Sequence, residues 1–193
     1  MRVVAVCLIV LLALPAVAGG SRLLLPAGED LAGNPDFERA EGDFAKGWTS
    51  YRSPGGMVPE YGLHGIDGTK GVRFRCPETA TGSVKPSSIS RALTEFPAGQ
   101  EIEVTAWLRL EKFAGTCVVW ARCDEADGPQ RREGAFENSA LRGYDLTGTS
   151  RWSPVTVRVT PDEATKVVHV GVLAGGTGSI LVHSIHARAP KAT

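Results

Sequence analysis

The chain has 193 residues and carries 21 basic and 21 acidic side chains, so its formal net charge at neutral pH is zero. The sequence contains no basic stripe, which argues against nucleic acid or an anionic membrane surface as the main partner. Its longest apolar run stands at the N-terminus and is too short to span a bilayer, so we expect no membrane span.

The first residues have the features of a secretory signal peptide. Arg2 precedes an apolar run from Val3 to Leu14, and small residues end the segment at Ala18. We expect cleavage after Ala18, which removes residues 1–18 and leaves residues 19–193 as one domain. The mature protein is therefore predicted to be secreted, or to stay in the periplasm or cell envelope.

The mature chain shows the alternation of apolar and polar residues that is typical of β-strands, without sustained helical periodicity. Glycine, proline and serine crowd residues 53–71, which we interpret as a long loop with room for one short strand. A glycine-rich turn is expected at 175–178. Strands are predicted at 71–76, 87–94, 100–110, 115–124, 154–160, 166–174 and 179–187. This pattern predicts an all-β fold, an antiparallel β-sandwich of the jelly-roll type.

Alternation assigns the two faces of the strands at 100–110 and 115–124. The first strand places its apolar residues on one face and leaves Trp107 and Arg109 on the other. The second does the same with Trp120 and Arg122. Each strand therefore presents a tryptophan and an arginine away from the core.

Three cysteines follow the predicted cleavage site: Cys76, Cys117 and Cys123. Cys117 and Cys123 share one predicted strand and lie about 20 Å apart when it is extended, too far for a bridge between them. They are either small buried residues, or one of them pairs with Cys76.

Two segments resemble galactose-binding-like jelly-rolls and related carbohydrate-binding modules. Residues 34–38 (Asn-Pro-Asp-Phe-Glu), followed by Gly47-Trp48, are similar to the opening motif of these modules, N-x-x-F-E and then G-W. The segment from Trp152 to the last strand is similar to their closing strands. Residues 135–138 and 143–152 resemble the A-F-D-N … G-T-T-D-W stretch of a bacterial subset, whose modules often accompany transcription regulators or enzymes.

This resemblance extends from about residue 29 to residue 188. It implies two antiparallel sheets, one of which has a concave face that carries aromatic residues for a glycan. Many members also hold a structural calcium, through an N-terminal glutamate and two aspartates near the C-terminus. Glu38 matches the glutamate, but His183 and Ser184 stand at the aspartate positions. Since calcium prefers carboxylate and carbonyl oxygens, we expect no calcium and no other cofactor.

Trp107 and Trp120 are the leading candidates for ligand binding, because sugar rings stack on aromatic planes. The polar partners expected beside them are Arg109, Arg122, Glu137 and Asn138. The alternative is that both indoles lie under a loop, with the arginine stems packed over them. Trp48 and Trp152 are interpreted as structural.

The histidines do not form a metal-binding pattern. His183 and His186 lie three positions apart in one predicted strand, so we expect them on opposite faces. His169 alternates with the apolar residues of its strand and is expected on the outer surface.

These observations predict an exported, non-catalytic module that binds a glycan or related ligand on a concave sheet face. The alternative is a structural or protein-interaction domain of the cell envelope that binds no sugar, with the same face as its interface. A small glycan-active enzyme is a third hypothesis, not favoured because no nucleophile motif is present. The ligand and the oligomeric state stay open.

Overall fold

The computed structural model describes residues 30–77, 84–130 and 132–189. The predicted signal peptide, residues 1–18, lies outside them. Across these described segments no helix has both the length and the apolar character needed to cross a bilayer.

The described chain is built almost entirely from strands. A short 3₁₀ helix, η1, covers Ile66–Gly68. The strands are β1 (Ala40–Glu41), β2 (Phe44–Ala45), β3 (Thr49–Arg52), β4 (Val58–Gly62), β5 (Gly71–Arg75), β6 (Ser87–Leu93), β7 (Ile102–Glu125), β8 (Gly128–Pro129), β9 (Phe136–Asn138), β10 (Ser153–Val159) and β11 (Val167–Arg188).

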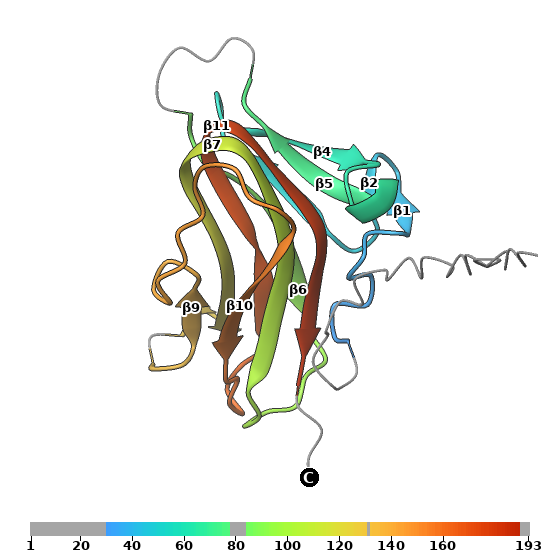
Figure 1. The fold of residues 1–193 in the computed structure, drawn as a ribbon. Helices are drawn as coiled ribbons and strands as arrows, with labels where there is room; N and C mark the ends of the chain where they lie inside the picture. Colours follow the sequence, from blue (N-terminus) through green and yellow to red (C-terminus); the bar gives the residue numbers. More distant parts are fainter. Residues whose placement is uncertain (1–29, 78–83, 131, 190–193) are drawn as a thin grey trace, which may run out of the picture.

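Two long antiparallel strands, β7 and β11, pair with each other from Val167 opposite Asp124 to Arg188 opposite Glu103. They arch together at one end of the molecule (Figure 1), so each strand contributes one half to each of two layers. We call the first layer the β5 sheet; its order is β10, the first half of β7, the second half of β11, β5, β4. The second, the β6 sheet, contains β9, the second half of β7, the first half of β11, β6 and β3.

The bend corrects one part of the sequence interpretation. Residues 100–110 and 115–124 form one strand instead of two, and the turn expected at 175–178 is a bend inside β11. Glycines permit the close approach of the two strands there. A Cβ on Gly115 would lie 2.2 Å from the Gly175 carbonyl oxygen, and one on Gly176 would lie 2.2 Å from that of Ala114. Both glycines have a φ of 148°, a conformation that other residues rarely adopt.

The hydrophobic core lies between the two sheets and is formed by the inward residues that alternation predicts. The β5 sheet contributes Ile102, Val104, Val155, Val157, Ile180 and Phe74, and the β6 sheet contributes Val119, Ala121, Val168, Val170, Val172 and Ile89. Cys117 and Cys123 also face this core, and burial raises the pKa of their thiols to about 12 and about 11. These two cysteines and Cys76 are free thiols, so the alternative of a Cys76 bridge is wrong.

The opening motif at 34–48 stabilises the loop in which it lies. The buried Asn34 side chain donates to the carbonyl oxygens of Arg39 (2.9 Å) and Lys46 (3.1 Å), and its own oxygen accepts from the Arg39 amide. Trp48 donates its indole N–H to the Asn34 carbonyl oxygen at 2.9 Å and packs edge-on against Phe37. The motif therefore fixes the loop that leads into the sandwich, and the structural role expected for Trp48 is confirmed.

We expect Gly176→Ala to lower the free energy of unfolding by about 3 kcal/mol, because the new Cβ would be strained by its φ and would collide with the Ala114 carbonyl. Gly99→Ala is the matched control: its φ is also positive, at 75°, but no atom lies within 4 Å of the position that a Cβ would take there, so about 1 kcal/mol is expected. Urea unfolding measures both values. Equal losses would show that the strand approach does not limit this bend.

Candidate functional site

The two candidate tryptophans lie on opposite layers of the sandwich. Trp107 stands in the half of β7 that pairs with β10, opposite Pro154, whereas Trp120 stands in the half that pairs with β9, opposite Asn138. The expectation that both rings form one platform on one sheet is therefore wrong. The reason is the bend between them, which carries the later half of β7 into the other sheet.

We call the outer surface of the β6 sheet the Trp120 face. Register places the following side chains on it: Trp120, Arg122 and Asp124 from β7; Phe136 and Asn138 from β9; His169, Gly171 and Leu173 from β11; Ser88, Ser90 and Ala92 from β6; Thr49 and Tyr51 from β3. In the middle of this face, Gly171 of β11 and the β6 residues Ser88, Ser90 and Ala92 form a strip of small residues, and His169 and Leu173 flank Gly171 along β11. Trp120 stands on one side of this strip and Tyr51, which is 62% exposed, on the other.

A charged cluster supports the Trp120 side of the face. The Arg122 guanidinium lies 5.9 Å from the centre of the Trp120 ring and donates two hydrogen bonds to Asp124, at 2.7 and 2.9 Å. His169 Nε2 lies 3.4 Å from the same carboxylate, which confirms its expected outward position. Burial lowers the pKa of His169, and so does Arg122, while Asp124 acts against them. The cluster holds Arg122 beside the ring in one geometry.

The two polar candidates on β9, Glu137 and Asn138, lie on opposite faces of the strand, because side chains alternate along it. Asn138 pairs with Trp120 and shares its face, and the Asn138 side-chain oxygen accepts from the Leu141 amide at 3.1 Å. Glu137 pairs with the core residue Ala121 and forms an ion pair with Arg142 at 2.8 Å. The structure therefore brings Trp120, Arg122 and Asn138 together and places Glu137 on the other side of the strand.

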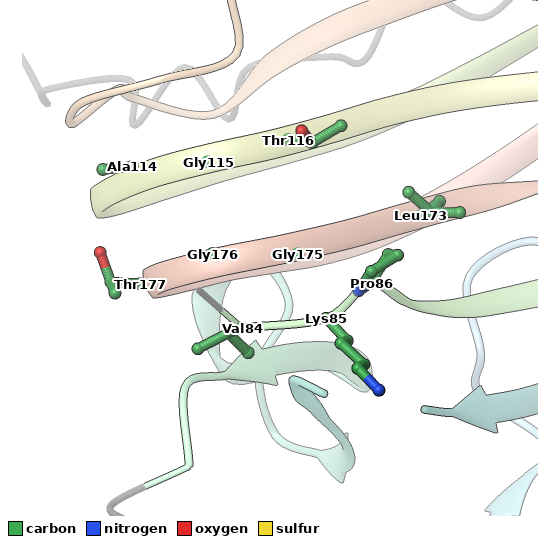
Figure 2. Close-up of a pocket in the computed structure, with 10 residues that line it drawn as sticks. All are labelled: Val84, Lys85, Pro86, Ala114, Gly115, Thr116, Leu173, Gly175, Gly176 and Thr177. Carbon is green, nitrogen blue, oxygen red and sulfur yellow. The ribbon is translucent and has the colours of Figure 1, made fainter. Parts of the chain in front are cut away.

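A pocket of about 420 Å³ continues the Trp120 face toward the bend. Figure 2 shows Gly115 and Thr116 of β7 beside Gly175 and Gly176 of β11, with segment 84–86 along the other side of β11. Leu173 and Thr116 line it from the sheet, and Lys85 and Pro86 from that segment. Bare glycine backbone thus makes room for a ligand group at this end of the face.

The other two candidates, Trp107 and Arg109, lie on the outer surface of the β5 sheet. Trp107 is half-buried between Pro154 and Ser184, its pairing partners in β10 and β11. The Arg109 guanidinium lies 5.8 Å from the centre of the Trp152 ring. Trp152 is half-buried on this outer surface, so its ring can contribute there besides any structural role.

Sequence reasoning missed Tyr51 and the strip of small residues. The strip had a signal: Ser88, Ser90 and Ala92 alternate with the buried Ile89 and mark an outer face without bulky side chains. Tyr51 had none, because β3 is short and shows no apolar alternation.

The histidines near the C-terminus lie closer together than alternation predicts. The register of β11 shifts between Val182 and Ser184, so His183 occupies a β-bulge. Its ring packs against Trp152 on the outer surface, where His186 also lies, opposite Thr105. The expectation of opposite faces is therefore wrong, because the bulge adds one residue to the alternation.

His186 is almost fully buried between two carboxylates of the N-terminal segment. Its Nδ1 lies 2.5 Å from Asp30 Oδ2, and its Nε2 lies 3.3 Å from Asp36 Oδ1. Burial alone would lower the pKa of His186, but the hydrogen bonds and charges of both carboxylates outweigh it and raise this pKa above its usual value. When protonated, the ring therefore fastens the N-terminal segment to β11 through both carboxylates.

Glu38, the candidate calcium ligand, is exposed at the end of the opening motif. Within residues 30–77, 84–130 and 132–189, no three His, Cys, Asp or Glu side chains come together as a metal-binding group. The expectation of no calcium stays a prediction.

No family model matches the chain, and no curated protein matches it. Among solved structures, it is similar to the enzymatically active domain of tailspike protein 4 from bacteriophage CBA120, with a TM-score of 0.59, 8% identity and 83% of this chain covered. The chain spans 21% of that protein's length. It is also similar to the CBM22-1 xylan-binding domain of Paenibacillus barcinonensis Xyn10C (TM-score 0.51, 15% identity, 88% of this chain and 99% of that chain).

A third similar structure is TmCBM61 in complex with β-1,4-galactotriose, with a TM-score of 0.55 and 17% identity, covering 83% of this chain and 99% of that chain. At these identities the likeness concerns the fold. It confirms the predicted all-β class: the chain folds as an antiparallel β-sandwich of the jelly-roll type.

The ion pairs of His186 predict a pH-dependent contribution to stability. Because its pKa is raised from 6.5 on folding, this contribution is complete below pH 6.5 and is lost as the pH rises through the folded value. The free energy of unfolding of the wild type should therefore exceed that of His186→Gln by a margin that shrinks as the pH rises above 6.5 and through the folded pKa of His186. Urea unfolding across this range measures the margin.

His64 and His169 have lowered pKa values and act in the opposite direction, but both proteins contain them, so they cancel in the difference. The charge of His186 is one cause of the lowered pKa of His183, so the margin is compared above pH 6.5, where His183 is neutral in both proteins. A margin that stays constant with pH would contradict the role assigned to His186.

Proposed function

We propose that the protein is a non-catalytic module that binds a saccharide across the Trp120 face. The observation that carries the proposal is the strip of small residues between two aromatic side chains. Trp120 on β7 and Tyr51 on β3 are separated by three strand spacings and by two residues along the strand direction, about 16 Å in total. A short glycan can lie over Gly171 and Ser90 with a sugar ring against each aromatic ring.

The polar groups along this strip suit the hydroxyl groups of a sugar. Ser88 and Ser90 present hydroxyls that both donate and accept, and Asn138 offers an amide beside Trp120. The Trp120 Nε1 atom is buried with no acceptor among the described residues, so its contribution is the ring surface. Arg122, fixed by Asp124, supplies donors in a constant position.

The fold likeness supports this function. One similar structure is described as a xylan-binding domain, and another was solved with β-1,4-galactotriose bound. The pocket beyond Leu173 gives the ligand a place to end or to branch. Export, which the N-terminal sequence predicts, would bring such a module to glycans outside the cytoplasm.

A protein ligand is the alternative occupant of this face. Phe136 and Tyr51 are exposed at its two edges, as in a protein-interaction surface. The small, hydroxyl-lined middle favours the saccharide, since the centre of a protein interface is enriched in large side chains. The same variants separate the two functions.

We expect Trp120→Ala and Tyr51→Ala each to weaken binding to a retained neutral polysaccharide about tenfold, which corresponds to about 1.4 kcal/mol per ring. Affinity electrophoresis in gels that contain xylan, β-glucan or galactan, after a glycan-array screen, gives the ligand and the loss. Tyr144→Ala is the control, because Tyr144 is 40% exposed on a loop outside the face.

Circular dichroism and urea unfolding establish that each variant keeps the fold. Unchanged retention of both folded variants, or equal weakening by Tyr144→Ala, would place the saccharide elsewhere. No glycan retention together with loss of a protein partner in the same two variants would favour the interaction domain.

A further inference from the structure

The outer surface of the β5 sheet, on the side of the sandwich opposite the Trp120 face, carries two adjoining pockets of about 540 and about 590 Å³. They share Glu111 and Thr149. The lining side chains that carry charge or an aromatic ring are Arg73, Arg75, Arg109, Glu111, Lys112, Arg151 and Trp152. We call this region the basic double pocket.

The double pocket concentrates positive charge in a chain that is neutral as a whole. Five of its lining residues are lysine or arginine and one, Glu111, is a carboxylate. The cations come from three places in the fold, namely β5, β7 close to the bend, and the segment before β10. The sequence spacing of these residues shows no basic stripe, so folding creates the excess.

Two of the five cations are already neutralised. Arg109 forms an ion pair with Glu111, and Arg75 forms one with Glu60 at 2.8 Å. Glu111 also accepts from the Ser179 hydroxyl at 3.0 Å, and the hydrogen bond from Arg109 is the main cause that lowers its pKa. Glu111 is thus held ionised and serves to position Arg109.

The other three cations form no close ion pair with a carboxylate among the described residues. The described residues place none within ion-pairing distance of Arg73, Lys112 or Arg151. Among the residues that the structure describes, Arg73 donates only to the Ser179 hydroxyl, at 3.5 Å, and its buried Nε has no acceptor. Lys112 is exposed and held in the left-handed region, with φ at 47°, at the point where β7 bends. Lys112 and Arg151 therefore border the pockets with no ion pair among the described residues, while Arg73 shares the charge of Glu111 with Arg109.

The second pocket also has an aromatic wall. The half-buried Trp152 ring lines it, and Arg109 lies 5.8 Å from the ring centre. The Trp152 ring beside the guanidinium of Arg151, which forms no ion pair among the described residues, suits a sugar that carries an anionic substituent. The sugar ring can stack on the indole while the fork of the arginine binds two oxygens of the substituent.

We infer that the basic double pocket binds an acidic saccharide, through the carboxylate or sulfate groups of its sugar units. This site differs from the proposed neutral-glycan face in position and in ligand charge, and does not depend on it. A nucleic acid fits less well, since a phosphate backbone requires a longer run of positive charge than these two hollows provide.

The test is retention of the purified protein on immobilised polygalacturonate, which carries carboxylates, and on heparin, which carries sulfates. We expect retention on at least one, decreasing with salt. Lys112→Gln/Arg151→Gln should weaken it at least about tenfold. The control Lys46→Gln/Lys166→Gln removes the same charge from two exposed lysines elsewhere and should leave retention unchanged. The polymer that retains the protein identifies the anionic group.

Two further variants separate a built site from general charge attraction. Arg73→Lys keeps the charge but loses the planar fork, and Trp152→Ala loses the stacking surface; both should reduce retention, whereas Trp152→Tyr should restore part of it. Trp120→Ala should leave acidic retention unchanged, so failure of the Trp120 face and failure of this site are distinguishable.

Three results would overturn the inference. The folded wild type passes both columns unretained; the control double variant loses as much as Lys112→Gln/Arg151→Gln; or duplex DNA displaces the protein as effectively as the acidic saccharide does.

Discussion

The pairing of β7 with β11 through one shared bend is the constraint on which the rest of the structure depends. Because the two strands stay hydrogen-bonded on both sides of the bend, each sheet is built around one half of the same pair. The other strands attach to its edges, β10, β5 and β4 on one layer and β9, β6 and β3 on the other. Glycine at 115 and 176 lets the backbones approach closely enough for the pair to turn without breaking.

The same bend decides which parts of the site the sequence could predict. Alternation correctly identified Trp107, Arg109, Trp120 and Arg122 as outward residues, since it requires only local pairing. It could not assign them to a sheet, because that depends on whether a glycine-rich segment ends a strand or bends it. A turn between two strands and a bend within one strand have the same glycine-rich composition. The sequence therefore suggested that the two tryptophans lie on one face, whereas the bend in β7 places them on different sheets. His183 shows the same limit, since one bulged residue reverses the face that counting predicts.

The resemblance to sugar-binding modules rested on motifs whose residues in this structure mainly hold the fold. Asn34 and Trp48 tie the loop at 34–48 to itself through buried hydrogen bonds, and neither side chain faces a candidate ligand surface. The residues that suit a ligand, Tyr51 and the strip from Ser88 to Ala92, lie in segments without a recognisable motif. Motifs of this kind identify a scaffold because packing restricts them, whereas the exposed face that would bind a ligand is free to vary.

The net charge of the whole chain is a poor guide to the charge of the ligands that one part of its surface can bind. The balance of 21 basic and 21 acidic residues argues against an extended polyanion, and that argument holds for a surface of uniform composition. Folding sorts the charges along the β5 sheet: Asp30 and Asp36 gather around His186, while the unpaired cations gather near the bend. Since exposed charges act over about one Debye length, roughly 8 Å at physiological salt, a ligand at the bend responds to the local excess. A neutral chain can therefore present an anion-selective hollow on one layer and a neutral, aromatic-flanked face on the other.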